Sequence, residues 1–137
     1  MANYVLPISG EWSNQTYPSK TTTAYAEGEW LANDGTNDIP ATTTSQLLRG
    51  INITVKAVGT SGTAQQIMRV PQSVNCTFRM VVSGTLTADM VGRGFDLASS
   101  TTVNQAASTY KPVILVQFID ANTGIFKLNL AEGVNAS

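Results

Sequence analysis

The sequence of 137 residues contains no histidine. Without an imidazole, the chain cannot build the Ser-His-Asp or Cys-His arrangements that activate a nucleophile. It has a single cysteine as well, so it cannot supply the usual donor sets of zinc or non-haem iron sites. The phosphate-binding patterns GxGxxG and GxxxxGK[ST] are also missing. We therefore expect a protein that is not an enzyme and that holds no metal and no cofactor.

These absences leave carboxylate chemistry open, because the chain has nine acidic residues. Two carboxyls about 5 to 9 Å apart could serve a glycoside hydrolase, and this alternative stays open. The neighbours of the acids favour turns instead, as in Asp34-Gly35 and Asp120–Gly124. Residues 33–38 carry oxygen ligands of the kind that Ca²⁺ takes, but they lack the closing glutamate of an EF-hand loop. We interpret this segment as a β-turn.

Charge is also scarce, since charged residues make up 12% of the chain and the net charge is −1. The eight basic residues are scattered singly, whereas nucleic-acid binding needs several cations on one face. No apolar run approaches the roughly 20 residues of a membrane-spanning helix, and the N-terminus does not resemble a signal peptide. We expect no nucleic-acid partner, no membrane partner and no secretion. The lone Cys76 is expected to be a small core residue.

Uncharged polar residues replace the missing charges: the chain has 18 Thr, 11 Ser and 10 Asn. Threonine is β-branched and suits a half-exposed strand, while serine and asparagine suit turns. The composition therefore predicts a β-rich protein with a polar, weakly charged surface.

The first twenty residues differ from the rest. They mix single apolar anchors with Pro7 and Pro18, which disfavour a helix and a central strand. We predict an extended N-terminal arm over residues 1–20 and one β domain over residues 21–137. The arm packs either on its own domain or on a neighbour, and the residues expected to bind a partner are Tyr4, Leu6, Ile8, Trp12 and Tyr17.

Beyond residue 20 the apolar pattern has a period of two. It predicts a hairpin around residues 33–35, a hairpin formed by 113–119 and 125–130, and strands at 51–58, 66–70 and 74–82. Single helical turns are expected at 44–48 and 87–92. In 51–58 the odd-numbered residues are expected to face the core, and the apolar run 113–116 is expected to be buried on both faces. Together these segments predict an all-β fold, a compact β-barrel or β-sandwich of about seven or eight strands.

The stretch from Thr21 to Thr36, followed by Arg49-Gly50-Ile51, resembles the small capsid decoration (cement) proteins of tailed bacteriophages. Residues 82–97 and 113–130 are compatible with the same family. The resemblance implies a homotrimer that binds the major capsid protein on the outer surface of an icosahedral shell, with its arm over neighbouring subunits. It also implies synthesis in the host cytoplasm and a final location in the virion.

A carbohydrate- or receptor-binding β module of a phage fibre or spike is the alternative. Such a module needs exposed aromatic side chains that stack on sugar rings. The candidates are Trp12, Tyr25, Trp30 and Tyr110, although Trp30 is expected to face the core.

Overall fold

The computed structural model describes residues 4–17, 23–33, 35, 37–55 and 66–129. These residues form eleven strands and one short 3₁₀ helix, η1 (Ala88–Met90), which confirms the predicted all-β class. The strands outnumber the seven or eight expected because short polar segments also pair. One of them is β9 (Thr102–Asn104), a segment with the sequence Thr-Val-Asn.

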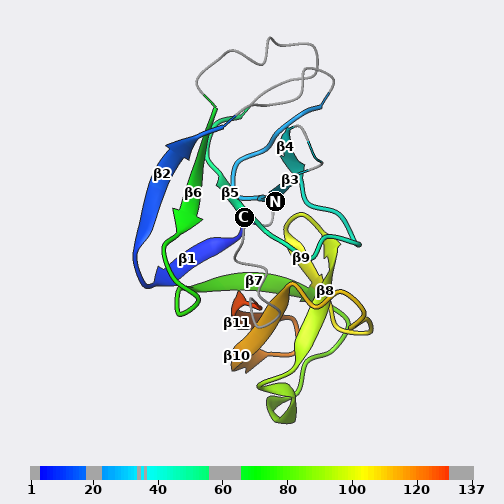
Figure 1. The fold of residues 1–137 in the computed structure, drawn as a ribbon. Coiled ribbons are helices and arrows are strands. Elements are labelled where there is room, and N and C mark those ends of the chain that lie inside the picture. Colours follow the sequence, from blue (N-terminus) through cyan, green and yellow to red (C-terminus); the bar gives the residue numbers. More distant parts are fainter. Residues whose placement is uncertain (1–3, 18–22, 34, 36, 56–65, 130–137) are drawn as a thin grey trace.

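The larger sheet closes into a five-stranded barrel. Its strand order is β1-β7-β11-β10-β8-β9, and β7 also pairs in parallel with β9, which closes the ring of five strands from β7 to β9 and leaves β1 outside it (Figure 1). The barrel strands are β7 (Thr77–Ser83), β8 (Gly94–Ser99), β9, β10 (Val113–Asp120) and β11 (Thr123–Leu128), and β1 (Leu6–Ser9) continues the sheet beside β7. The predicted hairpin near the end of the chain is confirmed as the antiparallel pair β10–β11.

The second sheet has five strands in the order β2-β6-β5-β3-β4 and lies above the barrel in Figure 1. Its strands are β2 (Trp12–Thr16), β3 (Trp30–Asn33), β4 (Asp38–Pro40), β5 (Gly50–Asn52) and β6 (Ile67–Pro71). The predicted hairpin around residues 33–35 is confirmed as β3–β4, in which Asn33 pairs with Asp38.

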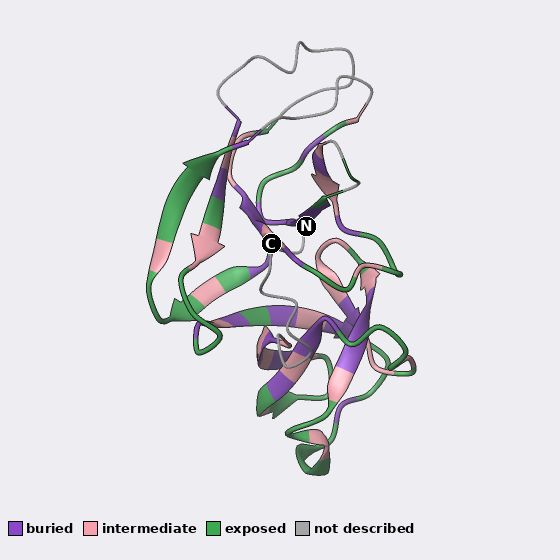
Figure 2. Ribbon diagram, in the orientation of Figure 1, coloured by how far each residue is buried: buried purple, intermediate pink, exposed green. Residues whose placement is uncertain are grey.

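The main core fills the barrel and extends to the second sheet. Along β7 the residues Phe78, Met80 and Val82 are buried and alternate with more exposed ones, which Figure 2 shows as stripes of colour. Trp30 of β3 is fully buried and its ring meets Phe78 edge-on, with centroids 4.8 Å apart. This aromatic contact is where the second sheet packs on the barrel. Cys76 is buried, which confirms the prediction of a small core residue.

The predicted N-terminal arm is built into both sheets over its described residues 4–17. Strand β1 pairs with β7, and β2 pairs along its whole length with β6. Of the two alternatives left open for this segment, the structure shows packing on its own domain. Pro7 does not prevent this because β1 is an edge strand, where the missing N–H is tolerated.

Three local predictions are wrong. In the segment predicted as strand 51–58, only residues up to Asn52 belong to a strand; Ile51 is buried as expected, but Asn52 is buried too and Val55 is 68% exposed, the reverse of the faces expected for these two residues. Residues 56–58 lie outside the described residues. The turn expected to be helical at 44–48 is a loop, and β10 is buried on one face only from Val113 to Val116. The helical turn predicted at 87–92 is present as η1, directly after Thr87.

Candidate docking surface

The structure divides the five predicted partner-binding residues into two groups. Tyr4, Leu6 and Ile8 are large apolar residues with 46%, 42% and 50% of their surface exposed. Trp12 is half-buried against the main core, and Tyr17 is buried in a second cluster with Tyr25 and Leu31. Only the first three are therefore available to another molecule.

Strand register places Leu6 on the outside of the barrel wall. Leu6 is directly opposite Arg79 on β7, and Arg79 is directly opposite Ile125 on β11. Ile125 in turn faces Gln117 on β10. Because residues directly opposite in an antiparallel pair point to the same side, these four side chains form one row across the sheet. Phe78, the neighbour of Arg79, points to the core.

A second row runs beside the first. The Ser9 hydroxyl lies 2.6 Å from the Thr77 hydroxyl, Thr77 faces Lys127, and Lys127 faces Ile114. Ile8 lies at the irregularity between these two rows, where the register of β1 and β7 shifts. We call this surface the outer face; its residues are Leu6, Ile8, Ser9, Thr77, Arg79, Ile114, Gln117, Ile125 and Lys127. It mixes apolar side chains with two cations.

Tyr4 is held at the start of β1 by a close contact with Gly28. Val5 N donates a hydrogen bond of 2.8 Å to Gly28 O, which brings the two segments together. Gly28 has a φ of +82°, and a β-carbon at this position would lie 2.8 Å from Tyr4 Cβ and Cδ1. Glycine is needed here for its conformation and its small size, because it lets the Tyr4 side chain lie directly against the backbone at this position.

Trp12 and Tyr17 have structural roles. The Trp12 indole N–H donates to Ser9 O, and its ring contacts Trp30 and Phe78. The Tyr17 hydroxyl donates to Asn52 Oδ1 over 2.5 Å. Burial, with smaller effects from Tyr25 and two nearby carboxylates, raises the pKa of the Tyr17 hydroxyl.

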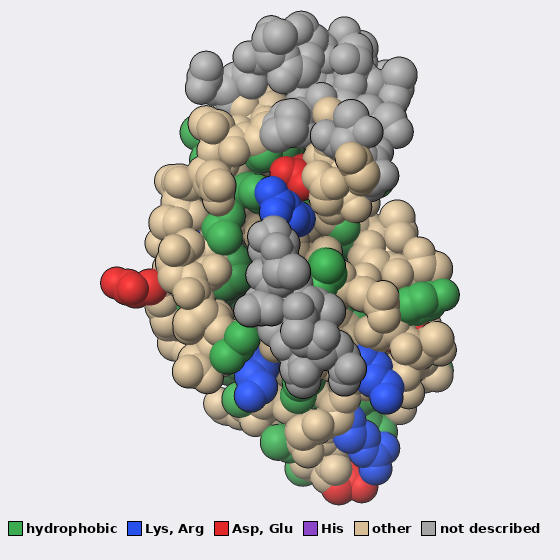
Figure 3. Space-filling model, viewed as in Figure 1, with side chains coloured by type: hydrophobic (Ala, Val, Ile, Leu, Met, Phe, Trp, Pro, Cys, Tyr) green, Lys and Arg blue, Asp and Glu red, His purple; other side chains and the backbone are tan. Residues whose placement is uncertain are grey.

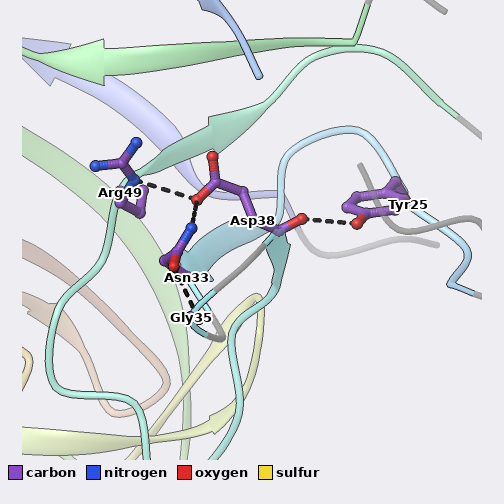
Figure 4. Close-up of polar contacts among 5 residues, drawn as sticks. All are labelled: Tyr25, Asn33, Gly35, Asp38 and Arg49. Atoms are coloured by element: carbon purple, nitrogen blue, oxygen red, sulfur yellow. Dashed lines mark hydrogen bonds and ion pairs between the residues drawn. The ribbon is translucent and has the colours of Figure 1, made fainter. Parts of the chain in front are cut away.

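Among the described acidic residues three are buried, and each is hydrogen-bonded within the domain itself. Glu29 accepts from Ala26 N and from the Ser100 hydroxyl, which ties the second sheet to the barrel. Asp96 accepts from the backbone N–H groups of residues 110 and 111. Asp38 accepts from Asn33 Nδ2 and Arg49 Nε, at 3.0 and 3.2 Å (Figure 4).

The segment that could have formed a calcium loop is a turn stabilised by its own side chains. Gly35 N donates to Asn33 Oδ1, and the Tyr25 hydroxyl donates to Asp38 O (Figure 4). Asp34 and Thr36 lie outside the described residues. Within the part of the chain that is described, no group of three or more Cys, Asp or Glu side chains could hold a metal ion.

A groove of about 1060 Å³ lies on the second sheet, between the loop of residues 42–49 and the loop of residues 72–74. Among its described lining residues, Arg49 is the single charged one and none is aromatic. The aromatic candidates for sugar stacking lie elsewhere: Trp30 and Tyr25 are buried, whereas Tyr110 is 38% exposed. The groove therefore offers no stacking platform among these residues.

On the face in Figure 3, most of the described surface consists of backbone and of side chains that are neither charged nor hydrophobic. Compared with protein-family models and with curated proteins, the sequence has no match. No helix in the described residues is long and apolar enough to cross a membrane.

Proposed function

We propose that the protein binds the outer surface of an icosahedral phage capsid and stabilises it by bridging neighbouring major capsid subunits. One observation carries the proposal: Tyr4, Leu6 and Ile8 expose large apolar side chains together at the edge of the six-stranded sheet. The resemblance of residues 21–36 and 49–51 to capsid decoration proteins supplies the partner.

Exposed apolar side chains gathered in one short segment are a common mark of a protein-binding surface. Aromatic and aliphatic anchors that enter pockets of a partner provide most of the binding energy of an interface. Tyr4, Leu6 and Ile8 lie within five consecutive residues, so one complementary surface can cover all three. The scarcity of exposed aromatic residues favours a protein partner over a sugar.

Stabilisation of the shell follows from mass action. A protein that binds only the assembled shell lowers the free energy of that state and leaves the free subunits unchanged. A molecule that spans two subunits adds its binding energy to the contact between them, so the shell dissociates or ruptures less readily.

The test is co-sedimentation with undecorated capsids of candidate tailed phages. Wild-type protein is expected to pellet with the shells at a saturating, fixed ratio to the capsid subunit. The double variant Leu6→Ser/Ile8→Ser is expected to lose this binding. The control is Val91→Ser, which removes an equally exposed apolar side chain next to η1 and is expected to bind as the wild type does. If the double variant binds as tightly as the wild type, the proposed surface is wrong.

From the same resemblance we also propose that the protein is a homotrimer. Light scattering on the purified chain is expected to give a molecular mass three times the 14.5 kDa of one copy. A mass of one copy, at concentrations that saturate the shells, would remove the trimer from the proposal and leave the capsid binding in place.

A further inference from the structure

We propose that the outer face recognises an acidic, partly apolar segment of the capsid protein, and that Arg79 and Lys127 pair with its carboxylates. This inference rests on the proposed function and specifies the chemistry of the partner. It is carried by the register of four strands, by the full or partial exposure of their outward side chains and by the distribution of charge on them.

The two cations are neighbours on one surface. Arg79 is directly opposite Ile125, and Lys127 is two residues further along the same strand. Such diagonal positions in an antiparallel pair are separated by about 7–8 Å between their Cα atoms. The two positive charges are therefore close enough to contact one acidic segment.

Neither cation is neutralised by the described part of the chain. No ion pair or side-chain hydrogen bond involves Arg79 or Lys127 there; the salt bridge present joins Arg49 to Asp38. The four strands β1, β7, β10 and β11 carry a single acid, Asp120. It lies next to the β10–β11 turn, where its carboxylate accepts a hydrogen bond from Asn122 N. The described residues of the outer face thus include two cations and no acid, in a molecule whose net charge is −1.

Apolar side chains surround the two cations. Leu6 and Ile125 flank Arg79 in the first row, and Ile114 is opposite Lys127 in the second. Nucleic acids bind through many phosphate contacts and need more cations than this. An interface of apolar contacts with a few charge pairs is instead typical of protein partners, where complementary charge directs the encounter and fixes the orientation. The observations favour an acidic protein segment.

The experiment measures the affinity of the protein for the same undecorated capsids. The variant Arg79→Glu/Lys127→Glu is expected to bind about 100-fold more weakly or worse, because like charges would then meet across the interface. The milder Arg79→Gln/Lys127→Gln is expected to weaken binding less and to reduce its dependence on salt. Thermal melts first establish that each variant folds.

The matched control is Arg69→Glu/Arg93→Glu, which makes the same change in net charge with two exposed arginines outside the outer face. It is expected to bind as the wild type does. Equal losses in both charge reversals would overturn the inference, since binding would then respond to net charge alone. Full binding by Arg79→Glu/Lys127→Glu, with loss in Leu6→Ser/Ile8→Ser, would overturn the inference and leave the proposed function intact.

Two further results separate the alternatives. Wild-type protein that binds no tested capsid at all contradicts the proposed function, and with it this inference. The second result comes from fluorescence anisotropy with labelled double-stranded DNA, which tests directly whether the outer face binds a nucleic acid instead of an acidic protein segment. DNA binding that Arg79→Glu/Lys127→Glu abolishes and the control retains would identify a nucleic-acid surface and overturn the choice of an acidic protein.

Discussion

Leu6 on β1 and Arg79 on β7 lie directly opposite each other on the outside of the barrel wall. The next residue along β7, Phe78, is fully buried on the inside, where it meets Trp30. Because side chains alternate between the two sides of a strand, one short segment of β7 serves both the core and the outer face. Substitutions on the two sides are therefore expected to have separate effects.

The first prediction compares these two sides. Phe78→Ala is expected to lower the free energy of unfolding by about 3–5 kcal/mol, because it opens a cavity at the contact with Trp30. Leu6→Ser/Ile8→Ser is expected to cost less than about 1.5 kcal/mol, since both side chains are already about half exposed. Urea denaturation measures both. A loss of several kcal/mol in the double variant would mean that these residues support the fold.

The second prediction concerns the buried hydrogen bond between Tyr17 and Asn52. Tyr17→Phe leaves Asn52 Oδ1 without this donor and is expected to destabilise the protein by about 1–3 kcal/mol at pH 7. The control Tyr110→Phe removes a hydroxyl from a partly exposed ring and is expected to change the stability by less than about 0.5 kcal/mol.

The same tyrosine predicts a dependence of stability on pH. Its pKa is raised in the folded protein, so an unfolded chain releases this proton at a lower pH than the native state does. The stabilising effect is fully present below about pH 10 and is lost as the pH rises through the folded pKa. The free energy of unfolding is therefore expected to fall above about pH 10. Tyr17→Phe is expected to make this fall shallower, and an identical slope in both proteins would contradict the assignment.

The third prediction concerns the ion pair between Asp38 and Arg49. Asp38 is almost fully buried, and Arg49→Met would remove one of the two donors to its Oδ1 atom. We expect a loss of about 1–3 kcal/mol, because a buried carboxylate keeps a large desolvation penalty. Arg93→Met is the control, since Arg93 is exposed and forms no ion pair within the described residues, and it is expected to stay within about 0.5 kcal/mol.

The fourth prediction uses two glycines with similar backbone conformations. Gly28 and Gly92 have φ angles of +82° and +96°, but a β-carbon would meet Tyr4 at Gly28 and nothing within 4 Å at Gly92. Gly92→Ala is expected to cost about 1–2 kcal/mol from the backbone conformation alone. Gly28→Ala is expected to cost more and to weaken capsid binding by displacing Tyr4. Equal losses of stability would indicate that Tyr4 moves aside freely.

Much of the fold could be predicted from the local alternation of apolar residues and from the turn residues. The alternation in Phe78, Met80 and Val82 identified β7 and its buried side, and the turn residues 120–124 identified the β10–β11 hairpin. The alternation wrongly predicted that Asn52 faces the solvent. Its amide is buried because it has hydrogen-bond partners there: it donates to Ala26 O and Thr54 O and accepts from Tyr17. Those partners are distant in sequence or belong to the backbone, so periodicity gives no sign of them.

The candidate site was only partly predictable. The apolar anchors Tyr4, Leu6 and Ile8 stood out in a polar segment, and the structure shows them exposed. Trp12 and Tyr17 could not be distinguished from these anchors in the sequence, but their side chains pack in the core. Arg79 and Lys127 were missed because they are far apart in the chain, and strand pairing alone brings them together. The alternation of Arg79 with buried neighbours was the one signal that it points outward.

The most direct test of the central claim is the stability of the shell itself. The test uses undecorated capsids of a phage to which the wild-type protein binds in the co-sedimentation experiment. The capsids are heated or exposed to low ionic strength with and without saturating protein, and their rupture is followed by light scattering. We predict that bound wild-type protein raises the rupture temperature and that Leu6→Ser/Ile8→Ser leaves it where it is without protein. Saturating wild-type binding with an unchanged rupture temperature would contradict the claim that the protein stabilises the capsid.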